Sequence, residues 1–384
     1  MVTDSRPTLG VGMIGHAFMG RAHSQAWRGV SAFFDLPVRP VMAALSGRSR
    51  ERATAAAATL GWAAAETDWK ELLKRDDVQI VDICTPGDTH AEIAIAALAA
   101  GKHVLCEKPL ANSVAEAEAM ADAARAAAEH GVRSMVGFNY RRVPAVTLAR
   151  DLVAQGRLGE IRHVRARHLQ DWLVDPEHPL EWRMRRDRAG SGALGDLGAH
   201  IIDATQFVTG RKITGVSGLS TTFISDRPLP DRSGTGRVTV DDAALFTARL
   251  ENGALASFEA TRFATGSKNA LQLEVNGSLG SVRFDFEAMN ELWFHDGTLP
   301  AEEAGFRRIL VTEPGHPYTG AWWPPGHGLG YEHSFTHQAN DLLTAIATDH
   351  EPSPSFADGL NVQRVLAAVE HSAAHESRWT PIGS

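Results

Sequence analysis

The sequence predicts an α/β protein with two domains, and three observations support this fold class. The chain has 384 residues, which suits two cores better than one. From residue 8 to about residue 138, apolar strands alternate with alanine-rich helices, as in a parallel sheet covered on both faces. After about residue 140, short alternating strands and two Asn-Gly pairs predict a large, mostly antiparallel open sheet with flanking helices. We expect one domain over residues 1–138 and a second over 139–384, whose last helices can pack back on the first.

The first domain is expected to be doubly wound, because each apolar run is followed by a helical one. Asp68 is a suitable N-cap for a helix beginning at Trp69, and Gly101 ends a helix over residues 91–100. Ser113 and Glu116 form a capping box for an alanine-rich helix that stops at residue 131. Five segments have the length and composition of buried strands: Thr8–Ile14, Pro40–Leu45, Val78–Cys84, Lys102–Glu107 and Arg133–Phe138.

Two tight hairpins are expected in the second domain. Asn252-Gly253 separates the strands FTARL and ALASFEA, and Asn276-Gly277 separates LQLEV and SLGSVRF. Asn-Gly is favoured in two-residue hairpin turns, which need positive φ angles. The stretch Glu313–Gly330 is rich in proline, glycine and aromatic residues, and we expect an ordered loop suited to the wall of a pocket.

The composition is that of an ordinary globular protein, with 43% hydrophobic and 22% charged residues. A net charge of −8 without any basic block argues against nucleic acid or an anionic membrane as a partner. The first residues lack the pattern of a signal peptide, and no apolar run is long enough to cross a membrane. Cys84 and Cys106 are the only cysteines and end buried strands, which indicates reduced thiols and a cytoplasmic location.

The residues after the first strand match a dinucleotide-binding turn. In GHAFMG, the first glycine permits a tight turn, the last permits close helix packing, and the helix N-terminus offers N–H groups to a pyrophosphate. Alanine stands where a second glycine is usual. An ordinary glycine turn is the alternative, but the position after the first strand of a βα series favours a cofactor. The expected cofactor-binding residues are Gly15, Ala17, Phe18, Met19 and Gly20.

The end of the second strand bears on the choice between NAD and NADP. An acidic residue there would bind the ribose 2′-hydroxyl of NAD and repel a 2′-phosphate, but this strand ends in Ser46-Gly47-Arg48. Ser46 and Arg48 can hydrogen-bond a 2′-phosphate and neutralise it. This slightly favours NADP. The alternative, that Arg48 is a solvated residue and the cofactor is NAD, carries almost equal weight.

Two further strand ends supply polar residues beside the expected cofactor. Thr85 and Pro86 follow one strand, with His90 close behind, and Glu107-Lys108 ends another. In open α/β sheets, ligands bind at the carboxyl ends of the strands. A lone lysine at such an end is more often a surface residue, but the Glu-Lys-Pro context favours function. We expect all five residues to contact the cofactor, and Lys108 also to act in catalysis.

The segment GSGALGDLGAHIID places Asp196 and His200 four residues apart, on one face of a helix. Gly190, Gly192 and Gly195 allow the backbone to approach another group closely. An isolated Asp-x-x-x-His is more often a helix-capping acid and a core histidine. Together with Lys108, the catalytic interpretation is favoured.

Five motifs, GHAFMG, ICTPGDTHAE, GKHVLCEKPLA, FNYRR and GALGDLGAHIID, resemble those of the glucose–fructose oxidoreductase / inositol 2-dehydrogenase / rhizopine-catabolism (Gfo/Idh/MocA) family. They cover residues 10 to about 205. The resemblance implies a Rossmann domain followed by an α/β domain with a large open sheet, through which members usually form homo-oligomers. Within the family, LQDW and the glycine-rich run resemble levoglucosan and related pyranoside dehydrogenases. This implies hydride exchange at a sugar carbon, often carbon 3, with roles for Lys108, Asp196 and His200.

The expected mechanism is oxidation of a secondary hydroxyl of a pyranose, anhydrosugar or glycoside. His200 accepts the hydroxyl proton, Lys108 stabilises the developing alkoxide, and Asp196 binds a neighbouring hydroxyl or orients the imidazole. Three other functions stay open: a redox-neutral NAD-dependent glycosidase, an inositol dehydrogenase, and a non-catalytic sensor. The candidate sugar-binding residues are Asn139, Tyr140, Arg141, Gln170, Trp172, Arg183, Asp196, His200, Trp323 and His333. For each of these except Asp196 and His200, a structural role is the alternative.

Two other clusters of residue types each allow a functional and a structural interpretation. The arginines at 183, 185, 186 and 188 are interpreted as a solvated basic strip, with an anionic sugar as the sharper alternative. The histidine pairs His333/His337 and His371/His375 have a spacing of four, but no third ligand with convincing spacing accompanies them. No metal is expected in the mechanism.

Overall fold

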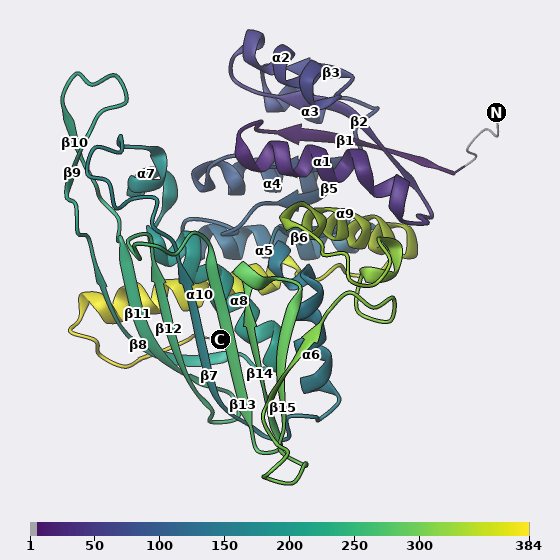
Figure 1. Ribbon diagram of the computed structural model, residues 1–384. Coiled ribbons are helices and arrows are strands. Elements are labelled where there is room, and N and C mark those ends of the chain that lie inside the picture. Colours follow the sequence, from purple (N-terminus) through teal and green to yellow (C-terminus); the bar gives the residue numbers. More distant parts are fainter. Residues whose placement is uncertain (1–5, 384) are drawn as a thin grey trace. The chain divides into compact units, whose positions relative to one another are not determined.

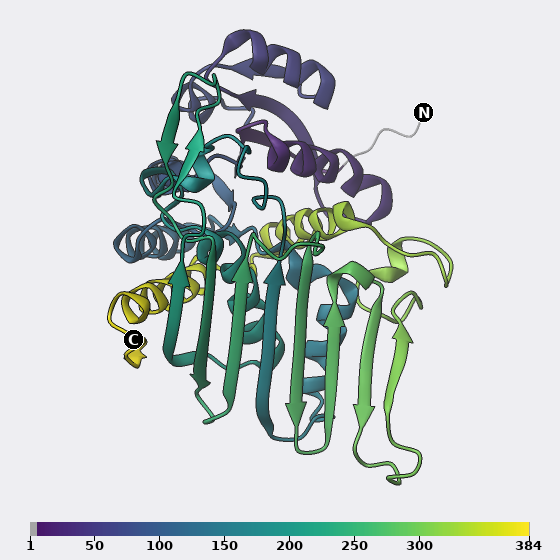
Figure 2. The ribbon, with the colours of Figure 1, turned by 60° about the vertical axis from the view of Figure 1, so that its left-hand side comes forward.

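A computed structural model of the protein describes residues 6–383 (Figure 1 and Figure 2). The chain divides into two compact units. The first contains the residues up to Asn139 together with Gly330–Leu360, and the second contains Tyr140–Leu329 and the residues from Asn361 onward. Within residues 6–383, no helix combines the length and the apolar character needed to cross a membrane.

The first unit is built on a six-stranded parallel sheet with the strand order β3-β2-β1-β4-β5-β6. The strand order reverses between β1 and β4, which is the switch point where doubly wound sheets bind dinucleotides. The doubly wound prediction is therefore confirmed, and the short strand β3 is an addition to it. The strands are β1 (Thr8–Ile14), β2 (Arg39–Ser46), β3 (Ala64–Glu66), β4 (Ile80–Ile83), β5 (His103–Cys106) and β6 (Ser134–Val136).

The helix caps of the first unit follow the sequence signals. The side chain of Asp68 accepts a hydrogen bond from the Lys70 N–H, and that of Ser113 accepts one from Glu116. The last predicted helix ends at Ala128, three residues earlier than expected, and Gly131 follows with a φ of 76°. The helices are α1 (Phe18–Phe33), α2 (Arg50–Leu60), α3 (Trp69–Leu73), α4 (His90–Ala99), α5 (Val114–Ala128) and α9 (Tyr331–Thr348).

The second unit contains a nine-stranded sheet with the order β16-β15-β14-β13-β7-β12-β11-β8-β17. Strands β7 and β12 pair in parallel and the other neighbours pair antiparallel, which confirms a large, mostly antiparallel sheet. The strands are β7 (Ile161–Leu169), β8 (Ile213–Thr221), β11 (Ala243–Leu250), β12 (Leu255–Thr261), β13 (Ala270–Gly277), β14 (Gly280–Asp285), β15 (Glu291–Asp296), β16 (Phe306–Leu310) and β17 (Thr380–Pro381). A separate hairpin joins β9 (Asp226–Pro228) to β10 (Thr235–Arg237).

One hairpin prediction was right and the other needs correction. Asn252-Gly253 lies in the turn between β11 and β12, with Gly253 at φ 85°. Asn276-Gly277 instead continues β13, and the turn falls at residues 278–279. Gly277 is required by packing, because a Cβ there would lie 2.0 Å from the Leu158 carbonyl oxygen. A close backbone approach therefore accounts for this glycine.

Helices cover one face of the large sheet, and the other face carries none within this unit (Figure 2). Helix α8 contacts β7 and β13, while α6 contacts β14 and β15. Val369 and Ser372 of α10 pack on Gly218 of β8. The helical elements are α6 (Pro144–Ala154), α7 (Arg186–Ala189), a π-helical turn (Leu194–Gly198), α8 (Ala199–Thr209) and α10 (Phe356–Ala374).

Candidate active site

The glycine-rich turn of the first unit has the geometry that a dinucleotide requires. Gly15 has a φ of 96°, and its N–H donates to the Ser46 carbonyl oxygen at 3.0 Å. A Cβ on Gly20 would lie 2.3 Å from the Gly15 carbonyl oxygen, so only glycine lets α1 begin this close to β1. Ala17 is exposed at the N-cap position of α1. The N-terminus of α1 lies at the switch point, where backbone N–H groups can meet a pyrophosphate.

We expect Gly20→Ala to destabilise the first unit by about 1–3 kcal/mol, because the added methyl group forces α1 away from the turn. Urea unfolding and a fluorescence titration with NADH measure the two consequences, lower stability and weaker binding. Gly29→Ala on the same helix is the matched control, since a Cβ there meets nothing within 4 Å. The control should gain about 0.5–1 kcal/mol. Equal behaviour of the two variants would contradict the packing argument.

The other predicted residues of this turn differ in accessibility. Phe18 is 62% exposed, and its ring lies parallel to that of Tyr331 with centroids 6.2 Å apart. Met19 packs against the core of the unit. Ser46 is buried at the end of β2, whereas the side chain of Arg48 is exposed. Arg48 is therefore accessible to a ligand, while Ser46 presents mainly its backbone.

His90 joins the loops that follow β4 and β5. Its Nε2 lies 2.9 Å from the Thr85 carbonyl oxygen, and its Nδ1 lies 3.0 Å from the Pro109 carbonyl oxygen. The ring is 1% exposed, so His90 acts on the site through the loops it connects. Thr85 and Pro86 lie in one of these loops and Lys108 in the other, both at the carboxyl edge of the sheet. Lys108 thus lies at the carboxyl edge of the parallel sheet, as predicted from the sequence.

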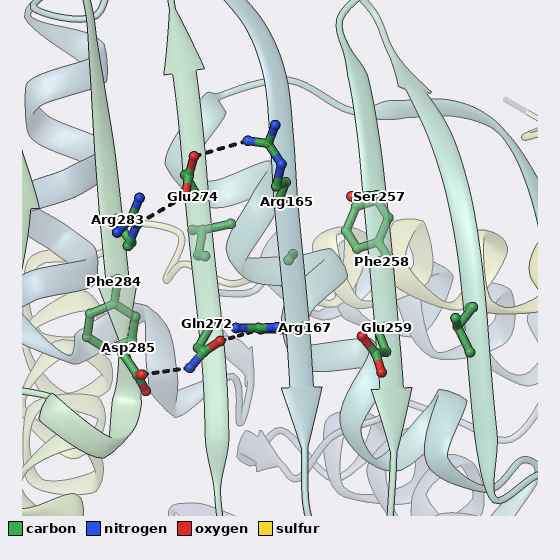
Figure 3. A pocket seen from close by; sticks show the side chains of 13 residues that line it. Arg165, Arg167, Ser257, Phe258, Glu259, Gln272, Glu274, Arg283, Phe284 and Asp285 are labelled. Carbon is green, nitrogen blue, oxygen red and sulfur yellow. Dashed lines mark hydrogen bonds and ion pairs between the residues drawn. The ribbon is translucent and has the colours of Figure 1, made fainter. Parts of the chain in front are cut away.

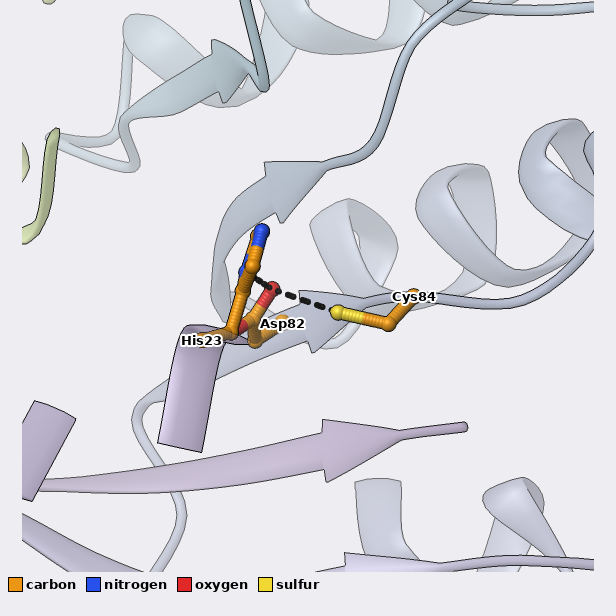
Figure 4. A group of neighbouring side chains, drawn as sticks. All are labelled: His23, Asp82 and Cys84. Atoms are coloured by element: carbon orange, nitrogen blue, oxygen red, sulfur yellow. Dashed lines mark hydrogen bonds and ion pairs between the residues drawn. The ribbon is translucent and has the colours of Figure 1, made fainter. Parts of the chain in front are cut away.

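A buried group of charged side chains lies behind Lys108. The His23 Nδ1 atom is 2.9 Å from both carboxylate oxygens of Asp82, and the Cys84 thiol donates to Asp82 at 3.6 Å (Figure 4). His23 Nε2 lies 3.0 Å from Oε1 of Glu107. Burial by itself lowers the pKa of His23, but the contacts with Asp82 and Cys84 together outweigh burial and raise this pKa well above its usual value. Glu107 was expected to contact the cofactor, but its carboxylate is 4% exposed and turned to His23.

In the second unit, Asp196 and His200 lie on the irregular helix that the glycine run begins. Residues 194–198 form a π-helical turn that continues directly into α8, a feature often found at functional sites. The Asp241 carboxylate accepts the N–H groups of Gly192 and Leu194 at 2.7 and 2.8 Å, which caps the helix start. A Cβ on Gly192 would lie 1.8 Å from the Asp241 carbonyl oxygen. Gly192 and Asp241 therefore fix the start of the turn that carries Asp196.

Asp196 is held by a buried arginine. Its Oδ2 lies 3.3 Å from Nη2 of Arg262, whose side chain is 1% exposed, while Asp196 itself is 25% exposed. The guanidinium also donates to the Arg183 carbonyl oxygen and lies over the Trp172 ring at 5.5 Å. Trp172 and Phe263 pack against a small second core. Arg262 thus orients the Asp196 carboxylate from the buried side, and the exposed part of that carboxylate is accessible to a ligand.

His200 lies in a group of aromatic and amide side chains. Its ring centroid is 4.5 Å from that of Tyr140 and 5.6 Å from that of His168. Asn269 donates to the Tyr140 hydroxyl at 3.0 Å. The side-chain Oδ1 of Asn269 accepts a hydrogen bond from the Gln170 amide at 2.7 Å and lies 2.8 Å from Nε2 of His168. Four residues of the second unit therefore form a connected group beside His200: Tyr140, His168, Gln170 and Asn269. Of these, Tyr140 and Gln170 were predicted from the sequence.

The remaining predicted sugar-binding residues have varied positions. The Arg141 guanidinium is buried, pairs with both carboxylate oxygens of Asp203 and lies over the Phe207 ring, which gives it a structural role. Asn139 is buried and donates to Ser334 within the first unit. Trp323 is 43% exposed in its loop. His333 accepts the Gly330 N–H through Nδ1 at the start of α9.

The basic strip is paired with acids. Arg185 lies 3.0 Å from Asp187, and Arg186 lies 2.9 Å from Glu370. The Arg183 guanidinium lies over the Trp182 ring at 4.4 Å. These partners support the interpretation of the strip as a solvated surface.

Several residues of the site were missed in the sequence: His23, Asp82, His168, Asp241, Arg262 and Asn269. Asp82 carried a usable signal, because a charge inside an apolar strand requires a buried partner. The predicted triad of Lys108, Asp196 and His200 contains residues from both units. Its convergence on one cofactor ring stays a prediction.

Comparisons with known proteins agree with the fold of the two units. Residues 9–138 match the family described as "Oxidoreductase family, NAD-binding Rossmann fold". Residues 146–283 match the family's C-terminal domain. A levoglucosan dehydrogenase from Pseudarthrobacter phenanthrenivorans is 41% identical over 388 residues, which covers 97% of this chain and 98% of that protein.

Two solved structures are similar over almost the whole chain. The crystal structure of an oxidoreductase domain protein from Kribbella flavida has a TM-score of 0.96 and 65% identity, and the match covers 98% of this chain and 100% of that one. A levoglucosan dehydrogenase in complex with NADH and levoglucosan has a TM-score of 0.94 and 42% identity, covering 98% and 99%. On the sequence motifs, the two-domain match and these relatives, the chain belongs to the Gfo/Idh/MocA family of oxidoreductases.

Proposed function

We propose that this NAD-dependent sugar oxidoreductase oxidises a secondary hydroxyl group, at carbon 3, of a pyranose, an anhydrosugar or a glycoside. The observation that carries the proposal is the placement of a partly exposed carboxylate, Asp196, and an imidazole, His200, four residues apart on one continuous helical segment of the second unit. The similarity to levoglucosan dehydrogenase over nearly the full chain supports an anhydrosugar or related pyranose as the substrate.

In the proposed mechanism, His200 accepts the proton of the reacting hydroxyl, and the Lys108 ammonium stabilises the alkoxide that develops. A bound nicotinamide would supply the acceptor for the hydride that leaves the sugar carbon. Asp196, oriented by Arg262, binds a neighbouring hydroxyl. Tyr140 and Gln170 are both hydrogen-bonded to Asn269 in the group of side chains around His200. In this proposal, the Tyr140 hydroxyl and the Gln170 amide bind hydroxyl groups of the sugar.

A substrate screen tests the proposal. We expect absorbance of the reduced nicotinamide to grow with pyranoses or anhydrosugars, levoglucosan among them, and NMR to identify a 3-keto product. Inositols and glycosides belong in the same screen. Oxidation of inositols alone would show an inositol dehydrogenase instead. Release of an aglycone without net reduction of the cofactor would show a redox-neutral glycosidase.

For the cofactor, we propose that NADP is accepted beside NAD through Arg48. The side chain of Arg48 is exposed at the end of β2. The neighbouring acid, Glu66 on β3, is engaged by Arg75 at 2.8 Å, so it does not compete for Arg48. A charge-assisted contact to the 2′-phosphate contributes about 1.5–3 kcal/mol.

We therefore expect Arg48→Ala to raise the KM for NADP about 10- to 100-fold, and to change the KM for NAD little. Steady-state kinetics with both cofactors measure this ratio. Arg50→Ala is the control, because Arg50 is exposed nearby but contacts Thr67. A wild-type enzyme that strongly prefers NAD, with no selective effect of Arg48→Ala, contradicts the role of Arg48.

We also propose that the protein is a cytoplasmic homo-oligomer that associates through the open face of the large sheet. Both cysteines are buried and reduced, which suits a reducing compartment. The open face has exposed leucines at positions 219, 245 and 255. Beside them, a hollow of about 540 Å³ is lined by hydrogen-bonded residues of β7, β13 and β14, including Arg165, Glu274 and Arg283 (Figure 3). A second copy of this face fits such a mixed apolar and polar surface.

Leu245→Lys is expected to reduce the oligomer to a smaller species. The new ammonium group is compatible with the fold, because Leu245 pairs across the strands with Glu259. Light scattering after size-exclusion chromatography measures the mass. Leu299→Lys, in an exposed turn, is the control and should leave the mass unchanged. A wild-type monomer contradicts the oligomer, and an unchanged mass for Leu245→Lys contradicts this interface.

A further inference from the structure

The buried contacts of His23 determine its protonation. The ring is 1% exposed and lies between two carboxylates, Asp82 on one side and Glu107 on the other. Figure 4 shows the second ring nitrogen pointing away from Asp82. A carboxylate can only accept hydrogen bonds, so each ring nitrogen must carry a hydrogen. A neutral ring would set a bare nitrogen against a buried carboxylate oxygen, at a cost of about 1–3 kcal/mol.

The carboxylates are fixed from several elements. Asp82 accepts the indole N–H of Trp27 at 2.7 Å and the thiol of Cys84 at 3.6 Å. The Phe335 ring of α9 lies 5.2 Å from the His23 ring and adds no charge. Burial raises the pKa of Cys84 to about 12 and that of Cys106 well above its usual value, so both are neutral thiols. Among residues 6–383, the charged groups that contact His23 are therefore the carboxylates of Asp82 and Glu107.

Glu107 connects this group to the lysine. Its Oε2 accepts the backbone N–H of Lys108 at 3.2 Å, and its own N–H donates to the Ile83 carbonyl oxygen. A Cβ on Gly137 would lie 2.8 Å from Oε1 of Glu107, so that glycine leaves room for the carboxylate. The contacts run from Asp82 through His23 and Glu107 to the backbone of Lys108.

We propose that His23 is a positioning residue: a permanently charged imidazolium that holds Glu107 and thereby fixes Lys108 in place for catalysis. The catalytic part of this inference rests on the proposed function of Lys108. The charge state of His23 is independent of that function. Substituting one member of the buried group Asp82, His23 and Glu107 should be strongly destabilising, because it leaves an unpaired charge in the interior.

The charge state is tested by NMR on the full-length protein labelled with 15N-histidine. We expect both ring nitrogens of His23 to be protonated from pH 6 to pH 9, with ring N–H protons that exchange slowly with water. His103 is the internal reference, because burial and the charge of Arg133 lower its pKa to about 4 and keep it neutral. Its Nδ1 accepts the Arg133 N–H. The spectrum of His23→Gln assigns the signals. A His23 ring with one bare nitrogen at pH 7 overturns the proposal.

The positioning role is tested by the kinetics of His23→Gln. Glutamine cannot donate to both carboxylates, so Glu107 and Lys108 shift, and a misplacement of about 1 Å can cost about 10²-fold in rate. We expect kcat to fall about 10- to 100-fold while the dissociation constant for NADH changes less than twofold. His103→Gln should lose stability without losing turnover. A folded His23→Gln enzyme with wild-type kcat overturns the positioning role, and parallel losses of kcat and NADH binding do so too.

The two proposals fail in different ways. If Lys108→Met turns over at the wild-type rate, the proposed function of Lys108 is wrong, while the NMR result for His23 still stands. If His23→Gln does not fold, the ring protonation of the wild-type protein decides the charge state. Glu107→Gln then tests the connection to Lys108, because it removes the charge and keeps the size of the side chain, and we expect the same loss of kcat.

Discussion

Lys108→Met is expected to lower kcat about 10²- to 10³-fold, because it removes the one cation that we assign to the developing alkoxide. Methionine keeps the length and apolar stem of lysine and removes only the charge. If the ammonium group acts in the transition state, kcat and kcat/KM fall by similar factors. The dissociation constant for NADH should change little, because we expect most of the cofactor's binding energy to come from the turn at Gly15 and the start of α1. Single-turnover measurements of nicotinamide absorbance give the rate of hydride transfer directly.

The matched control for this variant is Lys74→Met. Lys74 belongs to the same unit, its side chain is 70% exposed, and it pairs with Glu71 at 2.6 Å on the surface. We expect wild-type kinetics and a change in stability of less than about 1 kcal/mol, as for an exposed ion pair. If Lys108→Met also retains wild-type turnover, the electrostatic role of Lys108 is wrong.

The fold of the first unit could be predicted from the sequence because its signals are local. Asp68, Ser113 and Gly101 mark helix ends through contacts within a few residues. Gly15 and Gly20 mark the turn after β1 for the same reason. Gly277 shows the limit of this reasoning. Its requirement comes from Leu158, more than a hundred positions earlier in the chain, and the Asn-Gly pair gave the wrong turn position.

The candidate site residues also differ in whether their signals are local or depend on distant parts of the chain. Lys108, Asp196 and His200 stand in recognisable motifs, whereas their partners come from distant strands and look like ordinary core positions. Arg262 lies 66 residues from Asp196, and Asn269 lies 129 residues from Tyr140. Arg141 shows the same limit, since a basic residue in a family motif has a buried partner, Asp203, that its motif does not indicate. Partners of buried charges depend on tertiary packing, which the spacing of motifs does not contain.

His200→Ala is expected to lower kcat about 10²- to 10⁴-fold, because it removes the imidazole to which we assign the proton of the sugar hydroxyl. The ring packs on Tyr140 with centroids 4.5 Å apart, so its removal leaves a space beside that ring. Added imidazole should bind there and restore part of the rate. The kcat of the variant should also rise with pH, since hydroxide replaces the missing base.

His371→Ala is the control for this experiment, because His371 is exposed on α10 of the same unit and its ring stacks on His375 at 4.1 Å. It should keep wild-type kcat, and imidazole should not affect it. The combination of results separates a base from a structural residue. A residue that only packs against Tyr140 would lower stability, and neither imidazole nor high pH would restore turnover. If the His200→Ala enzyme is folded and keeps kcat within about twofold of wild type, another group accepts the proton, and His200 serves in packing instead.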